Sequence, residues 1–321
     1  MKTTLWSVLA AAIMAIANSS QAQNFPTKAI TIVVPASPGG AIDLAARLIG
    51  QKITESTAQP VLIDNKTGAT GIIGTDFVAK ATPDGYTLAL VASSHAINPS
   101  MRKIMPYDAI KGFEPVVLTH VVPLVLVVTP TLPIQSVKEL IAYGKANPGM
   151  LSFASSGAGG APHFSGELFK TMAGLDMIHI PYKGSTLAHP DLISGRTSIM
   201  FDTVAAISTQ VKSGKVRALG VTTSKRSSVL PQVPTMIEAG MAPYETSTWG
   251  GILAPAGTPK MVIAKLSIEV NKALSAPDVR QRLQDAGIEV GGGTPQQFTA
   301  FIQSEMVKWS KVAKDAGIQA E

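Results

Sequence analysis

Cysteine is absent from the 321-residue sequence. Its absence excludes disulfide bonds, thiolate metal sites and a cysteine nucleophile. It also excludes a lipid-modified N-terminal cysteine, so we expect a freely soluble exported protein. Long apolar runs are lacking after the first 22 residues, because His120 and Pro123 interrupt the run from Val116 to Val128. The sequence therefore predicts no membrane-spanning helix in the mature chain.

Blocks of like charge are also lacking. The formal net charge is +6, but five or more basic residues never stand together, so a nucleic-acid partner is not indicated. A diffuse positive charge can gather anionic ligands, and it equally fits a solvated surface. His95, His120, His179 and His189 show no metal-ligand spacing with carboxylates, so we expect neither a metal nor a cofactor.

The first 22 residues have the pattern of a secretory signal peptide. Lys2 gives a positive start, Leu5 to Ala17 is apolar, and Ser20-Gln21-Ala22 places small residues where a signal peptidase would cut. The apolar part is too short and wrongly flanked for a membrane span. We therefore expect residues 1–22 to be removed on export.

A strand–glycine loop–helix junction organises the mature chain. Ile30–Val34 is a β-branched run typical of a buried strand. Prolines and Gly39-Gly40 follow, and an amphipathic helix begins near Ile42. Such a junction directs free backbone N–H groups and the positive end of the helix dipole toward one point, which suits an anion. The alternative is an ordinary βα turn in which Asp43 and Arg47 form a surface pair.

A second junction repeats this order about 120 residues later. Leu151–Ala154 is a predicted strand, a glycine-rich loop runs from Ser155 to His163, and a helix containing Phe164 follows. Two such junctions predict one anion clamp in each of two domains.

Strands and helices alternate along the chain, which predicts an α/β fold with largely parallel sheets. In the predicted last helix, residues 295–315, an apolar stripe at helical spacing indicates a core-facing side, not a cofactor site. Two proline-containing segments, 129–133 and 230–235, are candidate crossings between domains. They predict a discontinuous lobe 1, residues 23–128 and 235–321, and an inserted lobe 2, residues 129–234.

Short motifs in this order resemble one known family over the whole mature chain. They are Val34-Pro35, Pro38-Gly39-Gly40, Asp43, Arg47, Asp84-Gly85-Tyr86, Glu139 to Ala142, Ser155, Gly160, His163, Gly166-Glu167, Pro181 to Gly184, Gly214 to Ala218, Val233-Pro234-Thr235 and Glu238-Ala239-Gly240. Together they look like the Bug-type periplasmic solute receptors, the binding proteins associated with tripartite tricarboxylate transporters.

The resemblance implies a two-lobed, flytrap-like fold of the periplasmic binding protein type II class, with a central sheet and flanking helices in each lobe. It implies a small carboxylate ligand, pinched through backbone N–H groups and ordered waters by loops that map to Ser37–Gly40 and Ser155–His163. It also implies transporter permease subunits as possible partners. The signal segment and the absence of cysteine predict a soluble monomer exported to the periplasm of a Gram-negative bacterium.

Some positions depart from the family pattern. Ala41 stands where glycine or serine is frequent, and Ser185 to Asp191 replaces a usual Ser-Ala-Pro-Ala continuation. Thr203 stands where asparagine is common. The last two departures concern the identity of the ligand rather than the carboxylate clamp.

Candidate ligand-binding residues come from both loops and from polar positions after other strands. They are Ser37, Gly39, Gly40, Ser93, Ser94, Asn98, Ser155, Ser156, Gly157, Gly160, His163 and Asp202. Asp202 could accept from a ligand or cap the next helix. His163, at the first or second position of its helix, could donate to a carboxylate or bond a neighbouring loop. Ser93, Ser94 and Asn98 follow a strand end, where α/β proteins bind ligands, but ordinary loop chemistry explains them equally.

Two classes of function remain open. One is a non-catalytic receptor that captures a carboxylate and presents it to a membrane permease or a sensor. The other is an exported hydrolase that uses a serine near the glycine-rich loops. The sequence has no G-x-S-x-G elbow, no phosphate-binding P-loop and no dinucleotide fingerprint, which favours the receptor.

Overall fold

The computed structural model describes residues 25–320, so the predicted signal peptide lies outside the described residues. The elements in chain order are β1 (Ile30–Val34), α2 (Ala41–Thr57), β2 (Val61–Asn65), the 3₁₀ helix η1 (Ala69–Gly71), α3 (Ile72–Ala79), β3 (Thr87–Ala92), α4 (Ser94–Met101), β4 (Phe113–Val128), α5 (Val137–Ala146), β5 (Leu151–Ser155), α6 (Ala161–Ala173), β6 (Met177–Pro181), α7 (Ser185–Ser194), β7 (Ile199–Thr203), α8 (Val204–Lys212), β8 (Arg217–Val221), β9 (Ser247–Pro255), α9 (Lys260–Ser275), α10 (Pro277–Asp285), β10 (Glu289–Val290) and α11 (Pro295–Asp315).

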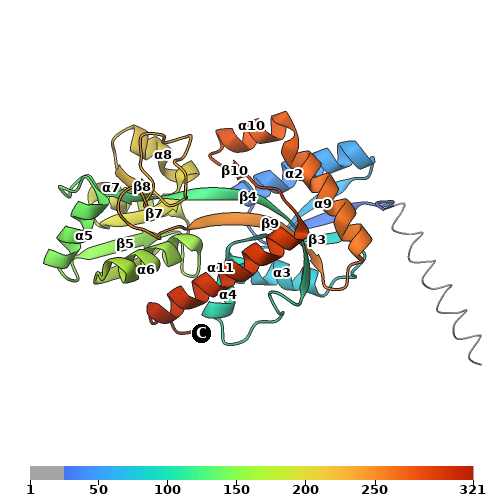
Figure 1. The fold of residues 1–321 in the computed structure, drawn as a ribbon, viewed down its shortest axis with the longest axis horizontal. Coiled ribbons are helices and arrows are strands. Elements are labelled where there is room, and N and C mark those ends of the chain that lie inside the picture. Colours follow the sequence, from blue (N-terminus) through green and yellow to red (C-terminus); the bar gives the residue numbers. More distant parts are fainter. Residues whose placement is uncertain (1–24, 321) are drawn as a thin grey trace, which may run out of the picture.

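One sheet runs through the described chain (Figure 1). Along its main path the strand order is β2-β1-β3-β9-β4-β7-β5-β6, and β8 and β10 both pair with β4. β1 lies parallel to β2 and β3, and β5 lies parallel to β6 and β7. β9 is antiparallel to β3 and β4, and β4 is antiparallel to β7. The prediction of largely parallel sheets is right for the outer strands and wrong for the centre, where the chain passes from one half to the other.

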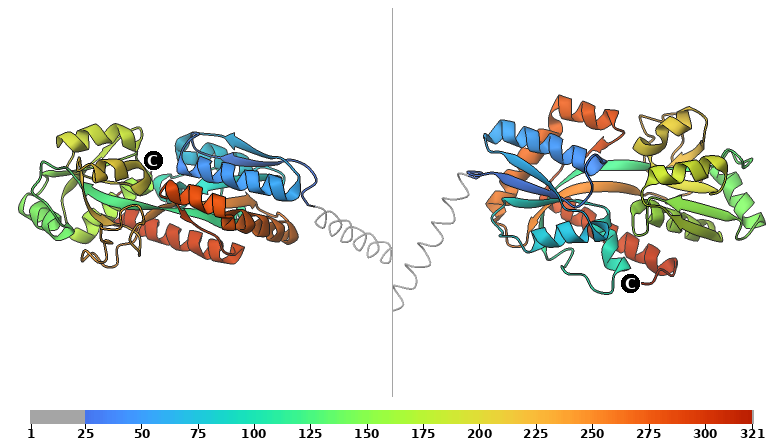
Figure 2. Two further views of the ribbon diagram at one scale, coloured as in Figure 1. Left: turned by 90° about the horizontal axis from the view of Figure 1, so that it is seen from above. Right: turned by 180° about the vertical axis from the view of Figure 1, so that it is seen from behind.

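β4 and β9 connect two halves of the molecule (Figures 1 and 2). The first half is built on β1–β3, β9 and the start of β4, and the second half on β5–β8 and the end of β4. Leu124–Val128 of β4 already pairs with β7 and β8 of the second half. On the return, Ser247 of β9 pairs with Pro123, while the preceding Thr246 donates its N–H to Thr222 O. Extended strands therefore make both passages.

The proline-containing segments expected to be crossings lie within the second half. Thr129 donates its N–H to Ser198 O, and Leu230 and Val233 belong to an apolar cluster with Val221 of β8. The prolines mark loops here, because strand pairing carries the chain across a few residues earlier. The expected lobe boundaries at 128/129 and 234/235 stay a prediction about which parts move together.

Helices cover both faces of the sheet. In the first half α2, α9 and α10 pack on one face, and α3, α4 and α11 pack on the other. Successive strand residues point to opposite faces, so Ile32 and Val34 of β1 belong to one cluster and Val33 to the other. In the second half α5 and α6 cover one face, and α7 and α8 the other. The predicted α/β class is confirmed.

The C-terminal helix α11 confirms the predicted core-facing stripe. Phe298, Ile302 and Trp309 are buried. Trp309 packs edge-to-face on Phe164 of α6, with ring centroids 5.8 Å apart, so α11 also reaches the second half. Within residues 25–320, no helix combines the length and apolar character needed to cross a membrane.

Candidate ligand site

Three loops of the first half meet at one edge of the sheet. They follow β1, β2 and β3, which are parallel and therefore end on the same side. A Cβ added to Gly71, after β2, would lie 3.5 Å from Pro35 and 3.6 Å from Ser94 Oγ, so all three loops touch. Open α/β sheets bind ligands at such edges.

α2 starts at this edge with Gly39 and Gly40. Gly40 is the N-cap, with an extended φ of −83° and ψ of 174°. Gly39 has a φ of +88°, which an L side chain adopts only with strain. A Cβ on either glycine would meet no described atom within 4 Å. The loop therefore presents bare backbone at the positive end of the helix.

Asp43, a buried residue of α2, binds one of the backbone N–H groups at this helix start. Its carboxylate accepts the Gly39 N–H at 3.0 Å, and Arg47 donates to both of its oxygens at 2.9 and 3.0 Å. Asn65 at the end of β2 donates a further bond at 3.0 Å. Burial disfavours the ionised carboxyl, but the bonds from Arg47, Gly39 and Asn65 outweigh burial and lower the pKa of Asp43. The expected pair of Asp43 and Arg47 is present, and its carboxylate also holds the Gly39 N–H.

α6 repeats this geometry in the second half. Gly160 is the N-cap, with φ −93° and ψ 165°, and Gly159 has a φ of +78°. Gly159 donates its N–H to His163 Nδ1 at 3.2 Å. Because α6 begins at Ala161, His163 is the third residue of the helix, not the first or second. Its ring bonds its own loop.

A second histidine lies against His163. The rings of His163 and His179, on β6, are stacked with centroids 3.9 Å apart. Ser155 Oγ lies 2.7 Å from His179 Nε2, accepts the Gly157 N–H at 3.2 Å and donates to Gly157 O at 3.0 Å. The ring of His163 therefore holds the Gly159 N–H. Ser155, which bonds His179, holds the N–H and the carbonyl oxygen of Gly157.

The surroundings keep both imidazoles neutral at pH 7. Burial lowers the pKa of His163 to about 3, assisted by His179 and Lys170, and lowers the pKa of His179 to about 4, assisted by Lys170. Glu167 Oε1 lies 3.7 Å from His163 Nε2, and burial raises the pKa of this carboxyl.

α4 replaces the polar loop predicted after β3. Ala96 and Ile97 are buried against α3 and α11, and this packing outweighs the helix-breaking tendency of Pro99. Asn98 donates from Nδ2 to Thr70 O at 3.1 Å. At its other end α4 faces the second half, because a Cβ on Gly159 would lie 3.8 Å from Met101.

Asp202 does not cap the helix that follows it. Thr203 is the N-cap of α8 and accepts the Ala206 N–H. One oxygen of Asp202 lies 2.7 Å from His189 Nε2, and the other accepts the Thr203 N–H at 2.8 Å. Buried Asp202 is thus tied to α7.

The structure gathers the candidates into two groups. The first half brings together the loops that hold Ser37, Gly39, Gly40 and Ser94. Ser93, next to Ser94, lies 3.0 Å from Thr248 of β9. The second half groups Ser155, Gly157, Gly160 and His163, with Ser156 between them. Sequence reasoning missed His179, which only strand pairing brings beside Ser155, because Phe153 of parallel β5 pairs with His179 of β6.

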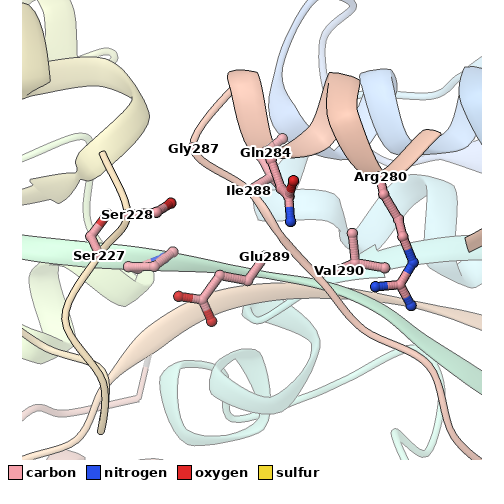
Figure 3. Close-up of a pocket in the computed structure, with 9 residues that line it drawn as sticks. Ser227, Ser228, Arg280, Gln284, Gly287, Ile288, Glu289 and Val290 are labelled. Atoms are coloured by element: carbon pink, nitrogen blue, oxygen red, sulfur yellow. The ribbon is translucent and has the colours of Figure 1, made fainter. Parts of the chain in front are cut away.

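A separate hollow of about 180 Å³ lies between the halves (Figure 3). It is lined by Ser227 and Ser228 after β8 and by residues of α10 and β10 that include Arg280 and Glu289. Its lining includes neither glycine-rich helix start. Residues 25–320 hold no group of three or more His, Cys, Asp or Glu side chains placed to bind a metal ion.

The chain belongs to the tripartite tricarboxylate transporter family of receptors, whose model matches residues 45–318. Protein BugT of Bordetella pertussis is 37% identical over 304 residues, which are 94% of this chain and 93% of BugT. A protein of R. palustris solved with adipate is 38% identical, with a TM-score of 0.81 over 92% of this chain and 100% of that one. MatC from Rhodopseudomonas palustris, solved with bound malate, is 32% identical, with a TM-score of 0.77 over 90% of this chain and 99% of MatC. The family and the two-lobed fold that the motifs implied are confirmed.

Proposed function

We propose that this protein is an extracytoplasmic receptor that captures a small carboxylate in the cleft between its two halves. It then delivers the carboxylate to a membrane transporter of the tripartite tricarboxylate type. The observation that carries the proposal is the repeated helix start, one in each half, where glycine backbone lies at the positive end of α2 and of α6.

Two relatives support the class of ligand. Adipate and malate are small dicarboxylates, and they are bound by proteins that share this fold at more than 30% identity. The N–H groups of Gly39 and Gly159 are already engaged by Asp43 and His163. We therefore assign the ligand contacts to the next N–H groups, those of Gly40, Ala41, Gly160 and Ala161.

The connections between the halves support closure around the ligand. Only β4 and β9 carry the main chain between the halves of the described structure, at Pro123–Leu124 and Thr246–Ser247. Such strand connections can act as hinges. We propose that the protein acts in the periplasm after removal of residues 1–22.

A hydrolase is disfavoured by the surroundings of the best serine. Ser155 Oγ lies close to His179 Nε2, as a nucleophile would lie close to its base. However, Ser155 is fully buried, and its hydroxyl proton is donated to Gly157 O. We infer that Ser155 is structural and that the protein returns its ligand unchanged.

The test is a thermal-shift screen of adipate, malate, citrate, benzoate and a set of amino acids, followed by calorimetric titration. A ligand that binds only the folded state raises the melting temperature. Trp249 and Trp309 both donate to Glu305, and Trp309 contacts α6, so tryptophan emission gives a second readout. A protein that binds no carboxylate, or that converts one to product, would contradict the proposal.

A further inference from the structure

We propose that His163 and His179 are positioning residues that act as neutral imidazoles. They hold the Ser155–Gly160 loop in its binding conformation and leave the positive start of α6 free for the negative charge of the ligand. This inference rests on the proposed function, because it assigns residues that prepare the same site.

The hydrogen bonds define the protonation of His163. Its Nδ1 accepts the Gly159 N–H, so the ring proton must sit on Nε2 when the ring is neutral. A proton on Nδ1 would remove the acceptor and leave the Gly159 N–H without this partner. The loop in this conformation therefore requires neutral His163.

The hydrogen bonds also define which atom of His179 carries a proton. Ser155 Oγ has one hydrogen, which it donates to Gly157 O, and it accepts from Gly157 N–H. His179 Nε2 must then be the donor to Ser155 Oγ across 2.7 Å. His179 thus fixes Ser155, and Ser155 fixes both polar groups of Gly157.

Positive charge around the two rings opposes protonation of the pair. A proton on both rings would place two positive charges on imidazoles whose centroids are 3.9 Å apart. Lys170 adds positive charge from α6, where it lies 3.8 Å from Glu167. Glu167 Oε1, 3.7 Å from His163 Nε2, is the neighbour whose negative charge would favour a proton on His163, but burial raises the pKa of this carboxyl. Phe153 of β5 stacks on both histidines.

Asp43 is the residue of α2 that corresponds to His163, and it brings a charge that neutral His163 does not. Asp43 makes the same bond to its glycine, but it brings a negative charge that Arg47, four residues on, neutralises. In α6 the residue four positions after His163 is Glu167. An aspartate at 163 would leave an unneutralised negative charge beside the ligand's carboxylate.

Two substitutions at one position separate charge from positioning. In His163→Asn and His163→Asp the new side chain offers an oxygen to the Gly159 N–H, and the two differ by one charge. We expect His163→Asn to bind the tightest carboxylate of the screen within about threefold of wild type. His163→Asp should bind it roughly tenfold to a hundredfold more weakly, the range for loss of a charge-assisted hydrogen bond.

A matched pair on the same helix controls for the added charge. Thr171 is exposed near the far end of α6, so Thr171→Asn and Thr171→Asp should bind alike. Melting temperatures of all four proteins show that titrations report on folded material. Equal affinities of His163→Asn and His163→Asp would overturn the proposal, while binding by wild type would leave the proposed function intact.

His179 is tested by its hydrogen bond. His179→Gln keeps a donor toward Ser155 and should rescue binding, whereas His179→Phe keeps the stacking without a donor and should bind at least roughly fivefold more weakly. Equal binding by His179→Phe and His179→Gln would contradict the role of this donor.

The pH profile gives a readout that a merely structural role would not move. Neutral histidines predict no tighter binding between pH 7 and pH 5.5. Tightening over this range that disappears in His163→Asn would show a cationic His163 that binds the ligand directly, and would overturn the inference.

Discussion

The two glycine-rich helix starts have nearly the same backbone conformation, but the side chain that holds the loop is charged in one and uncharged in the other. In both, a glycine with positive φ precedes a glycine N-cap, and the third helical side chain accepts the first glycine's N–H. In α2 that side chain is Asp43, paired with Arg47 and Asn65. In α6 it is neutral His163, stacked on His179.

The difference leads us to expect that the helix dipole alone does not set the affinity of each helix start for an anion. The start of α2 contains an internal carboxylate whose charge Arg47 neutralises, while the start of α6 contains an uncharged ring. Their exposure differs as well, because Gly39 is exposed and Gly159 is buried beneath Met101. We expect the two halves to contribute unequally to binding, with α6 receiving more of the ligand's negative charge.

Acid should produce the largest effect, and it acts on the α6 side. The pKa of each histidine falls from 6.5 to about 3 for His163 and to about 4 for His179 on folding. Below pH 6.5 the unfolded chain therefore takes up protons that the folded chain refuses, so the free energy of unfolding falls as pH falls toward 4. The limit is roughly 1.4 kcal/mol per pH unit for each histidine.

Urea unfolding between pH 7 and pH 4.5 measures this loss. The double variant His163→Asn, His179→Gln should show a shallower dependence. His95 and His120, with pKa values lowered by burial to about 4, contribute to the slope in both proteins. A slope that is the same in the double variant and in wild type would contradict the assignment.

Valine at either N-cap glycine should block binding. Gly40 and Gly160 have negative φ, and an added Cβ meets nothing closer than 3.6 Å at Gly160 and no described atom within 4 Å at Gly40. The fold should therefore tolerate Gly40→Val and Gly160→Val, while the side chain takes the ligand's volume. Losing one or two charge-assisted bonds predicts roughly a tenfold to several-hundredfold drop in calorimetric affinity.

Gly160→Val should cost more affinity than Gly40→Val, because we expect α6 to receive more of the ligand's negative charge. Lys145→Ala, an exposed change on α5, should leave the affinity unchanged. Binding within a factor of two of wild type in both valine variants would mean that the carboxylate is held elsewhere.

Removal of Asp43 should destabilise the first half. Asp43→Ala leaves the Gly39 N–H without its acceptor and removes one of the two hydrogen bonds that Asn65 Nδ2 donates, the other going to Ala36 O. We expect a loss of about 1–2 kcal/mol in unfolding free energy. Arg47→Ala should cost less, because its side chain is 52% exposed and its charge is screened by solvent. Urea titration of both variants decides the order, and a larger loss for Arg47→Ala would show that the ion pair outweighs the buried bonds.

Alanine at the positive-φ glycines should give the smallest effects. Gly39→Ala and Gly159→Ala each force an L residue to φ near +80° to +90°, which costs about 1 kcal/mol. The loss should be similar in the two halves, because an added Cβ is uncrowded at both sites. A much larger loss at Gly159, measured by thermal unfolding, would show that contact with Met101 matters more than backbone strain.

The sequence predicted features that depend on neighbours along the chain. The strand–glycine loop–helix order, the pair of Asp43 and Arg47, and the buried stripe of Phe298, Ile302 and Trp309 are local, because a helix or strand repeats with a short period. The family resemblance rests on the same short motifs. α4 is the exception, because a polar loop was expected at Ser93 and Ser94 and the packing of Ile97 produced a helix.

Contacts between segments far apart in the sequence could not be predicted, because they depend on how the chain packs. His179 reaches Ser155 through the register of parallel β5 and β6, and Asp202 reaches His189 across the gap between β7 and α7. The chain crosses between halves inside β4, at Pro123–Leu124, because strand pairing rather than the prolines at 129–133 sets the passage. The start of each helix, and the glycine backbone there, could be predicted from the local sequence. The chemistry at each start, an internal charge in α2 and a pair of neutral rings in α6, depended on burial and on strand register. Burial and register arise only when segments far apart in the sequence pack together.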